Sequence, residues 1–210
     1  MGSPAHGGRL IVLEGADGSG KTTLAKAIVS ALRAEGREVT LTSEPWDRAT
    51  LDHARGLTPR AAHMQFVADR ARHVERVILP ALARGEVVVC DRYALSGVVY
   101  ALAADPELGA RSAWRREGVD WRTGESALPR PDLTLVCDAG DKVLNGRIAG
   151  RASASEIDTD LALQARVRDL YHRSMWRIQP TDWRCRAVET SSTPEWSLEQ
   201  ALGFVREVLG

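Results

Sequence analysis

The amino-acid sequence predicts an α/β fold in three layers, a doubly wound parallel sheet of about five strands with helices on both faces. Two observations carry this prediction. Short apolar runs alternate along the chain with longer segments in which apolar residues recur at helical spacing. A glycine-rich loop separates the first apolar run from the first helical segment, as in a strand–loop–helix unit.

Five segments are predicted as strands, and two of them are apolar throughout most of their length. Val87–Cys90 and Asp132–Cys137 show no polar alternation, which is typical of central parallel strands buried on both faces. The predicted strands, in chain order, are Leu10–Leu13, Val39–Thr42, Val87–Cys90, Asp132–Cys137 and Arg186–Glu189.

The helices are predicted from apolar spacing and from glycines that end them. The first begins after the glycine-rich loop and ends at Gly36. A long helix is expected over Arg60–Arg84, kinked at Pro80 and ended by Gly85. The last two predicted helices are Leu161–Arg177 and Ser197–Leu209, the latter with Ser197 as its N-cap. The segments Ser43–Pro59 and Ala104–Arg130 are predicted to be turn-rich and loop-rich, respectively.

Composition limits the classes of function. Lys plus Arg and Asp plus Glu both number 28, so the net charge is zero, which argues against a nucleic-acid or membrane-surface binder. The cysteines Cys90, Cys137 and Cys185 fit neither a disulfide framework nor a zinc site, and they favour a reducing cytoplasm. No apolar run is long enough for a membrane span. Residues 1–8 are predicted to be a flexible N-terminus and 9–210 a single domain.

The glycine-rich loop matches the phosphate-binding pattern G-x-x-x-x-G-K-[ST] without substitution, which indicates a P-loop NTPase fold and a bound nucleoside triphosphate. Backbone N–H groups and the following helix N-terminus favour a polyphosphate, Lys21 can reach its β- and γ-phosphates, and the Thr22 hydroxyl can ligate Mg²⁺. The predicted nucleotide-binding residues are Gly15, Ala16, Asp17, Gly18, Ser19, Gly20, Lys21, Thr22 and Thr23.

A second group of polar residues follows the third predicted strand. Asp91 and Arg92 come at its carboxyl end, where open α/β sheets bind their ligands. Asp91 can serve Mg²⁺ or orient the attacking group, and Arg92 can clamp a phosphate through its guanidinium.

A third group lies on the long helix. Phe66 and Arg70 are four residues apart and share a helical face. The pair can stack a base and donate to its edge, which favours thymine or uracil over cytosine because thymine O4 is an acceptor. A core phenylalanine beside a surface arginine is the alternative.

These motifs, in this order, resemble the thymidylate kinase family along nearly all of the chain. The matching stretches are Ile11–Thr23, Ser43–Pro45, Phe66–Arg70, Asp91–Tyr100 and Leu128–Leu133. The segment after Asp91 and the Asp120–Trp121 pair are most similar to the eukaryotic branch.

The resemblance implies an ATP-dependent phosphorylation of dTMP to dTDP, assisted by Mg²⁺, in a cytoplasmic homodimer. It implies that Thr22 and Asp91 serve the metal and that Lys21, Asp91 and Arg92 are catalytic. The implied substrate-binding residues are Asp17, Pro45, Phe66, Arg70, Arg92, Ser96, Gly97 and Tyr100.

The lid region departs from the family pattern. Family members place an extra arginine in the phosphate-binding loop or in a mobile lid, and Gly18 occupies the loop position here. Arg147 and Arg151 are therefore the expected lid cations, within a lid at about residues 146–158. The family's Tyr-Gln is Tyr100 followed by Ala101, so one base contact can be missing.

Several alternatives stay open at this point. One is a kinase of a modified pyrimidine nucleoside monophosphate, which the altered lid and Ala101 would fit. Another is a nucleotide-binding protein that has lost turnover. A deoxynucleoside kinase is a poorer match to Glu44–Pro45 and Arg92. A GTPase is disfavoured because this chain has no Asn-Lys-x-Asp segment to bind guanine.

Overall fold

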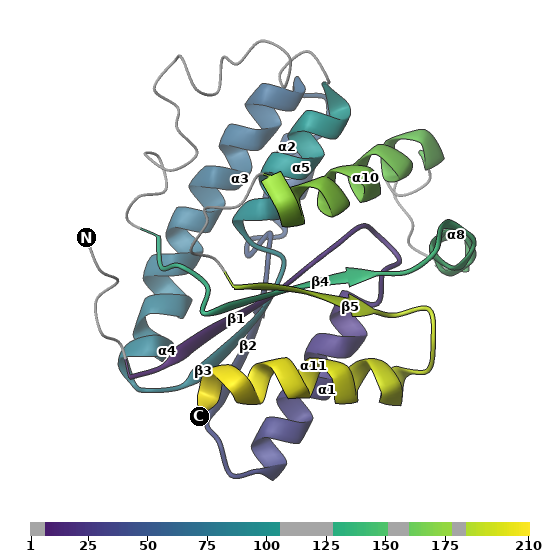
Figure 1. Cartoon of the computed structure of the whole chain (residues 1–210). Coiled ribbons are helices and arrows are strands. Elements are labelled where there is room, and N and C mark those ends of the chain that lie inside the picture. Colours follow the sequence, from purple (N-terminus) through teal and green to yellow (C-terminus); the bar gives the residue numbers. More distant parts are fainter. Residues whose placement is uncertain (1–6, 106–127, 151–159, 178–183) are drawn as a thin grey trace.

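A computed structural model describes residues 7–105, 128–150, 160–177 and 184–210. Within these ranges, five strands form one all-parallel sheet in the order β2-β3-β1-β4-β5 (Figure 1). The strands are β1 (Arg9–Glu14), β2 (Val39–Ser43), β3 (Val87–Asp91), β4 (Leu133–Asp138) and β5 (Cys185–Glu189). All five predicted strands are therefore confirmed, and so is the predicted fold class.

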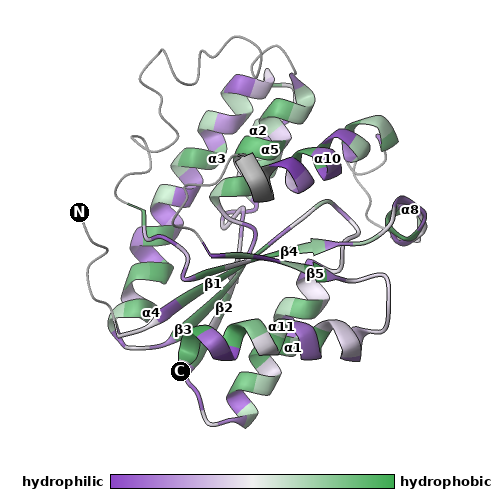
Figure 2. Cartoon of the chain, in the orientation of Figure 1, coloured by the Kyte–Doolittle hydropathy of each residue, from purple (hydrophilic) through white to green (hydrophobic). Residues whose placement is uncertain are grey.

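Helices cover both faces of the sheet. The described helices are α1 (Lys21–Ala34), α2 (Ala49–Ala54), α3 (Pro59–His73), α4 (Leu79–Ala83), α5 (Ala94–Ala104), α8 (Asp141–Ala149), α10 (Leu161–Arg177) and α11 (Pro194–Leu209). In Figure 1, α1 and α11 lie on one face, and α3, α5 and α10 lie on the other. The central strands β1, β3 and β4 are coloured as largely apolar in Figure 2, as strands buried on both sides require.

The core is divided by the sheet. On one face, Ile11, Leu13 and Val89 pack against α1 and α11. On the other face, Leu10 and Val88 pack against the helical segment that leads into α4. Because alternate residues of β1 and β3 point to opposite faces, both faces of these two strands must be apolar.

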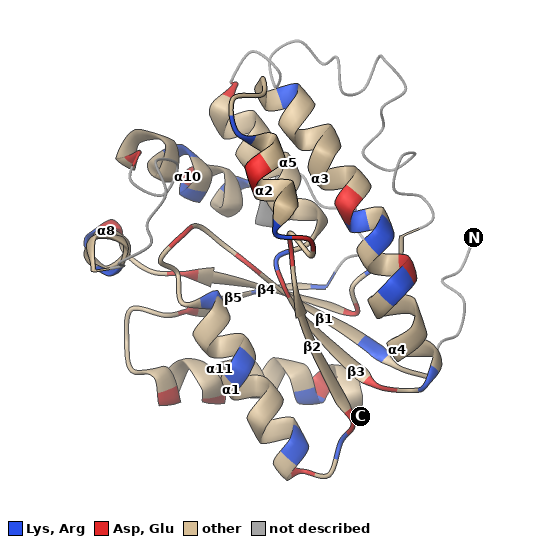
Figure 3. Cartoon of the chain, turned by 180° about the vertical axis from the view of Figure 1, so that it is seen from behind, with Lys and Arg blue, Asp and Glu red and all other residues tan. Residues whose placement is uncertain are grey.

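Charged residues of both signs are spread along the helices. Figure 3 shows Lys and Arg interspersed with Asp and Glu, in keeping with the net charge of zero. In the described part of the chain, no helix combines the length and the apolar character that a membrane crossing needs.

The segment predicted as one helix over Arg60–Arg84 is helical throughout, but its hydrogen-bond pattern changes from α to π and back to α. α3 ends at His73, and a π-helical turn over Val74–Ile78 connects it to α4. The Leu79 N–H donates to the Val74 carbonyl, five residues back, so the irregularity lies before Pro80. Proline occupies the start of α4, where its missing N–H has little effect.

Three local predictions need correction. The segment predicted as turns contains α2, a short helix in which only Thr50 is buried, so apolar spacing gives no signal. No helix was predicted at α5, because its sequence is almost wholly apolar and has no polar face. The short α8 was missed as well, and the predicted loop Ala104–Arg130 falls mostly outside the described residues.

The predicted N-cap of the last helix is also wrong. α11 begins at Pro194, and the Thr193 side chain accepts a hydrogen bond from the Trp196 N–H at 3.3 Å. Ser197 lies one turn inside the helix, where its hydroxyl donates to the Glu189 carbonyl at 2.9 Å. Thr193, directly before proline, and Ser197, four residues later, are both possible N-caps in the sequence, and only the packing of the structure separates them.

This assignment predicts that Thr193→Ala destabilises the protein by about 1 kcal/mol, because the Trp196 N–H loses its acceptor. In a chain of this size, the expected decrease in Tm is about 2–4 °C. Thermal unfolding followed by circular dichroism measures it. Thr193→Ser, which keeps the hydroxyl, is the matched control, and equal Tm values for the two variants would contradict the assignment.

Candidate active site

The phosphate-binding loop lies at the carboxyl end of β1, between β3 and β4. Gly15 has φ +142°, and a Cβ built there would lie 2.3 Å from the Cys137 carbonyl oxygen of β4. Gly18 has φ +80°, and its Cβ would lie 2.9 Å from the Leu144 carbonyl oxygen of α8. The loop can therefore pass between β4 and α8 only with glycine at both positions.

Lys21 begins α1, and its side chain is buried and folded back onto the loop. Its Nζ donates to the Ala16 carbonyl at 2.7 Å and to the Ser19 hydroxyl at 3.3 Å. Burial, with a further contribution from the positive charge of Arg92, lowers the pKa of Lys21 to about 8. No described side chain caps the N-terminus of α1, which leaves this positive helix end facing the loop.

Thr22 and Asp91 meet across the ends of two neighbouring strands. The Thr22 hydroxyl donates to Asp91 Oδ2 at 2.5 Å. Asp91 Oδ1 is buried and has no hydrogen-bond partner among the described residues. A buried carboxylate oxygen without a donor, beside a hydroxyl, is a donor set that suits a hard cation such as Mg²⁺.

Arg92 follows Asp91 in a left-handed conformation, with φ +73°, which is uncommon for a residue other than glycine. Its guanidinium forms a close ion pair with Asp17 of the phosphate-binding loop. It also lies 5.2 Å from the centre of the Tyr100 ring. Burial alone would lower the pKa of Arg92, but Asp17 and the other acidic groups around it, Asp91 among them, together outweigh burial, so the net shift is upward and the group stays charged.

Asp17 joins three elements at one carboxylate. Besides Arg92, it accepts a hydrogen bond of 2.6 Å from the Tyr100 hydroxyl of α5. Gln164 of α10 reaches both its backbone N–H, at 3.3 Å, and its carboxylate, at 3.4 Å. The sequence reading did not include Gln164, although a buried amide on the apolar face of an amphipathic helix was an available signal.

Arg70 is buried on α3 and ion-paired, so it is not the surface arginine of the alternative reading. Its Nε donates to Glu44 Oε2 at 2.8 Å, and one terminal nitrogen donates to the Tyr93 carbonyl at 3.1 Å. His73 Nδ1 lies 3.3 Å from the other Glu44 oxygen. Glu44 is thus held between two basic side chains of the same helix.

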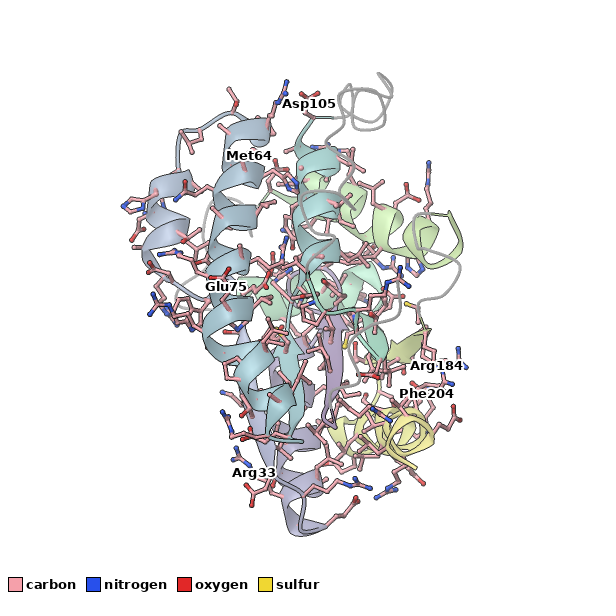
Figure 4. The ribbon with its side chains drawn as sticks, turned by 90° about the vertical axis from the view of Figure 1, so that its left-hand side faces the viewer. Arg33, Met64, Glu75, Asp105, Arg184 and Phe204 are labelled. Atoms are coloured by element: carbon pink, nitrogen blue, oxygen red, sulfur yellow. The ribbon has the colours of Figure 1, made fainter. Side chains whose placement is uncertain are left out.

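Phe66 lies on α3, like Arg70, and Gly97 lies on α5, which packs against α3. Phe66 is half-buried on α3. A Cβ at Gly97 on α5 would lie 3.2 Å from Arg70 and 3.3 Å from the ring of His63, so the two helices approach closely there. In Figure 4, Met64 near the start of α3 and Asp105 after the end of α5 lie at the same end of this pair, so the helices run antiparallel.

The segment with Pro45 is anchored by Asp69, which the sequence reading did not single out. The Glu44–Pro45 peptide is cis. The buried Asp69 carboxylate accepts from the Trp46 N–H at 2.7 Å and from the Asp47 N–H at 3.2 Å. A carboxylate directly before Arg70 therefore fixes the loop that follows β2.

Of the two predicted lid arginines, one lies in the described residues and contacts the phosphate-binding loop. Arg147, in the last turn of α8, donates to the Gly18 carbonyl at 3.3 Å and to the Thr190 carbonyl at 2.7 Å. Arg151 and the rest of the predicted lid beyond Gly150 lie outside the described residues.

Ser96, predicted to line the substrate pocket, is directed toward the interior. Its hydroxyl donates to Glu14 Oε2 at 2.5 Å and lies 2.9 Å from the Tyr171 hydroxyl. Glu14 and Tyr171 were not among the predicted site residues. A carboxylate in an otherwise apolar strand was the signal for Glu14.

The structure thus brings the predicted polar residues into two neighbouring groups. The first, at the carboxyl ends of β1 and β3, contains Asp17, Lys21, Thr22, Asp91, Arg92, Tyr100 and Arg147. The second, between α3 and α5, contains Phe66, Arg70 and Gly97 beside the Glu44–Pro45 segment. Cationic groups dominate the first, so it can receive polyphosphate, while the second adds a half-buried ring and a buried arginine.

Comparison with known proteins agrees with this geometry. A family model described as thymidylate kinase matches residues 13–183. A probable thymidylate kinase of Pyrococcus abyssi is 38% identical over 178 residues, covering 78% of this chain and 81% of the relative. The thymidylate kinase of Thermomicrobium roseum is 35% identical over 208 residues and covers 95% of both chains. That of Cereibacter sphaeroides is 34% identical over 203 residues, covering 90% of this chain and 89% of the relative. The chain therefore belongs to the thymidylate kinase family.

Proposed function

We propose that this protein transfers the γ-phosphoryl group of ATP to dTMP, producing dTDP and ADP. The observation that carries the proposal is the convergence of Lys21, the Thr22–Asp91 pair and the Arg92–Asp17 pair at the ends of two adjacent strands. Family membership supports the choice of donor and acceptor. Phosphoryl transfer needs positioning and charge neutralisation more than covalent help from the protein, and this arrangement supplies both.

On the donor side, the loop Gly15–Thr22 and Thr23 bind the phosphates of ATP. Lys21 leaves the Ala16 carbonyl and contacts the β- and γ-phosphates, exchanging a neutral acceptor for an anionic one. Thr22 and Asp91 hold Mg²⁺, which when bound neutralises charge on the phosphates. The buried, unpartnered Asp91 Oδ1 supports this assignment.

On the acceptor side, Arg92 binds the dTMP phosphate. Its guanidinium is fixed by Asp17 and by the face of the Tyr100 ring, so little side-chain ordering remains when the phosphate arrives. Asp17 borders the sugar and phosphate, Ser96, Gly97 and Tyr100 line the base and sugar pocket on α5, and Pro45 closes the nucleotide site. Two anions must approach one another in this site, which the cations make possible.

The base lies between α3 and α5. Phe66 stacks on the thymine ring, and Arg70 donates a hydrogen bond to its O4. The ion pair with Glu44, at 2.8 Å, orients the guanidinium before the base enters.

Arg147 and Arg151 act as the lid cations, in a lid over residues 146–158 of a single domain spanning 9–210. The contact between Arg147 and the Gly18 carbonyl supports the part of this proposal that concerns Arg147. Such a cation would stabilise the charge that develops between the two phosphates.

A homodimer in the cytoplasm completes the proposal. Met64 on α3 and Leu161 at the start of α10 are 48% and 54% exposed, and these two helices are the proposed dimer contact. The free thiols of Cys90 and Cys137 are buried, and burial raises the pKa of Cys137 to about 12, so this thiol stays protonated. Unpaired cysteines suit a reducing compartment.

The first experiment is an ADP-release assay with ATP, Mg²⁺ and a panel of dTMP, dUMP, dCMP, dGMP, UMP and thymidine. We expect the highest kcat/KM on dTMP. Turnover on none of them, with ATP binding retained, would contradict the proposal and favour a modified pyrimidine nucleotide or a protein without turnover.

The lowered pKa of Lys21 predicts that ATP binding is coupled to proton uptake. At pH 8 about half of Lys21 is neutral in the empty site, and the incoming phosphates raise its pKa, so the complex takes up about half a proton. Calorimetry in two buffers of different ionisation enthalpy measures this uptake. At pH 6.5 the uptake should vanish, because Lys21 is already charged. Lys21→Met should abolish it at pH 8, and unchanged uptake in that variant would assign the proton elsewhere.

The same shift predicts how stability depends on pH in the absence of nucleotide. Lys21 has its usual pKa of 10.5 when unfolded and about 8 when folded, so between these values the unfolded state binds more protons. This residue's contribution to the free energy of unfolding therefore rises as the pH increases from about 8 to about 10.5. The difference between wild type and Lys21→Met in urea unfolding, followed across this range, isolates it.

The Arg70 assignment predicts a change in base choice. Arg70→Ala would leave Glu44 buried without its main partner, at a cost of about 3–5 kcal/mol, and the fold could fail for that reason alone. Arg70→Lys keeps a cation beside Glu44 but loses the guanidinium fork. We expect its preference for dTMP over dCMP, as a ratio of kcat/KM values, to fall by about tenfold or more.

The double variant Arg70→Met, Glu44→Gln removes both charges together and should lose the same preference. Arg76→Lys, an exposed arginine in the π-helical turn, is the matched control and should retain it. An unchanged dTMP to dCMP ratio in both test variants would refute the role of Arg70.

A further inference from the structure

The last residue of β1, Glu14, is a fully buried carboxylate that accepts hydrogen bonds from two other elements. Oε1 accepts from the backbone N–H groups of Tyr93 at 3.0 Å and Ser96 at 3.2 Å. Oε2 accepts from the Ser96 hydroxyl at 2.5 Å and from the Tyr171 hydroxyl at 2.9 Å. Glu14 therefore connects the central strand β1 to the N-terminus of α5 and to Tyr171 of α10.

The two backbone contacts cap α5. Tyr93 is the N-cap residue of this helix, and its own side chain makes no capping hydrogen bond. Tyr93 and Ser96 occupy the positions whose N–H groups a capping side chain normally serves. Glu14, which belongs to β1, takes the place of that capping side chain, and its carboxylate lies at the positive end of the helix.

The same carboxylate is coupled to Arg92. Arg92 lies directly before Tyr93, with φ +73°, so the Tyr93 N–H held by Glu14 belongs to the peptide that leaves the strained residue. Arg92 also donates from its guanidinium to the Ser96 hydroxyl at 3.3 Å, and that hydroxyl in turn donates to Glu14. Glu14 is therefore linked to the backbone of Arg92 through the Tyr93 N–H and to its side chain through the Ser96 hydroxyl.

Burial makes this arrangement costly for the charged carboxylate. Burial raises the pKa of Glu14, while the hydrogen bond from Ser96 and the positive charge of Arg92 act in the opposite direction. Glu14 acts as the acceptor in all four of these contacts, two from backbone N–H groups and two from hydroxyls. A buried carboxylate contributes little to stability, so its role is sought in the groups that it orients, which are the Arg92 turn and the start of α5.

We infer that Glu14 is a positioning residue for the phosphoryl acceptor: it holds the Asp91–Tyr93 turn and the start of α5 so that the Arg92 guanidinium faces the acceptor phosphate. Glu14 acts through Arg92 and does not touch the substrate. The inference rests on the proposed role of Arg92 in binding the dTMP phosphate.

Two variants test it without removing the whole cluster. Glu14→Gln keeps one oxygen for the two backbone N–H groups, but its amide now donates toward the two hydroxyls and reverses their order. Tyr171→Phe removes a single donor from Oε2 and leaves the cap intact. Glu14→Ala removes all four acceptor contacts and serves as the limiting case.

The measured quantities are KM for dTMP, KM for ATP, kcat and Tm. For Glu14→Gln we expect KM for dTMP to rise about tenfold, the effect of losing one hydrogen bond to a charged group, with KM for ATP changed less than about twofold. Tyr171→Phe should shift KM for dTMP in the same direction by a smaller factor. Glu14→Ala should exceed Glu14→Gln, so the conservative variant gives partial rescue.

Asp132→Asn is the matched control for lost stability. Its carboxylate also accepts a backbone N–H, from Leu10 at 2.8 Å, but at the opposite end of the same central strand. It should lower Tm and leave the two KM values in their wild-type ratio. If Glu14→Gln behaves like this control, with no selective rise in KM for dTMP, Glu14 is only structural and the inference is overturned.

Arg92→Met, measured in parallel, separates the inference from the proposed function. A large rise in KM for dTMP in Arg92→Met, without a selective rise in Glu14→Gln and Tyr171→Phe, overturns the inference and leaves the role of Arg92 standing. An unchanged KM for dTMP in Arg92→Met overturns both. A selective rise in all three supports both.

Discussion

The site depends on the parallel pairing of β1 with β3 on one side and β4 on the other. In this pairing Leu13 is aligned with Asp91, and Glu14 with Val136, so the carboxyl ends of the three strands lie at the same edge of the sheet. Parallel strands place all their following loops at the same edge of the sheet. The phosphate-binding loop, the Asp91–Arg92 turn and the loop before α8 therefore meet without any long connection. No side chain of the site needs to reach across the molecule.

Lys21, Arg70 and Arg92, the cations at the centre of the site, each have a partner within the protein. Arg92 is paired with Asp17, Arg70 with Glu44, and Lys21 with a loop carbonyl. Such pairing keeps buried cations satisfied when no phosphate is present. It also fixes their orientation, so that binding energy is not used to order long side chains. The arrangement explains how a chain of zero net charge can concentrate cations where two anions must meet.

The buried carboxylates have a different task from the cations. Glu14 caps α5, Asp69 holds the loop after β2, and Glu44 lies between Arg70 and His73. Glu14 and Asp69 accept from groups next to proposed substrate contacts, whereas Glu44 accepts from the guanidinium of Arg70 itself. They form a supporting layer whose geometry decides where the guanidinium groups point.

The sequence alone determined the strands, the phosphate-binding loop and the family, because these depend on local apolar runs and on residues at fixed spacing. It also paired Phe66 with Arg70 on one helical face, since that needs only the helical period. It could not place Ser96, whose hydroxyl turns inward to Glu14, nor find Gln164 and Asp69, whose partners lie far away along the chain. It misplaced the cap of α11 and missed α2, which is mostly exposed, and α5, which is almost wholly apolar, because neither shows the apolar spacing of an amphipathic helix. Only the tertiary structure decided these points, because a polar residue within an apolar pattern can be noticed in the sequence, but its hydrogen-bond partner on a distant segment cannot.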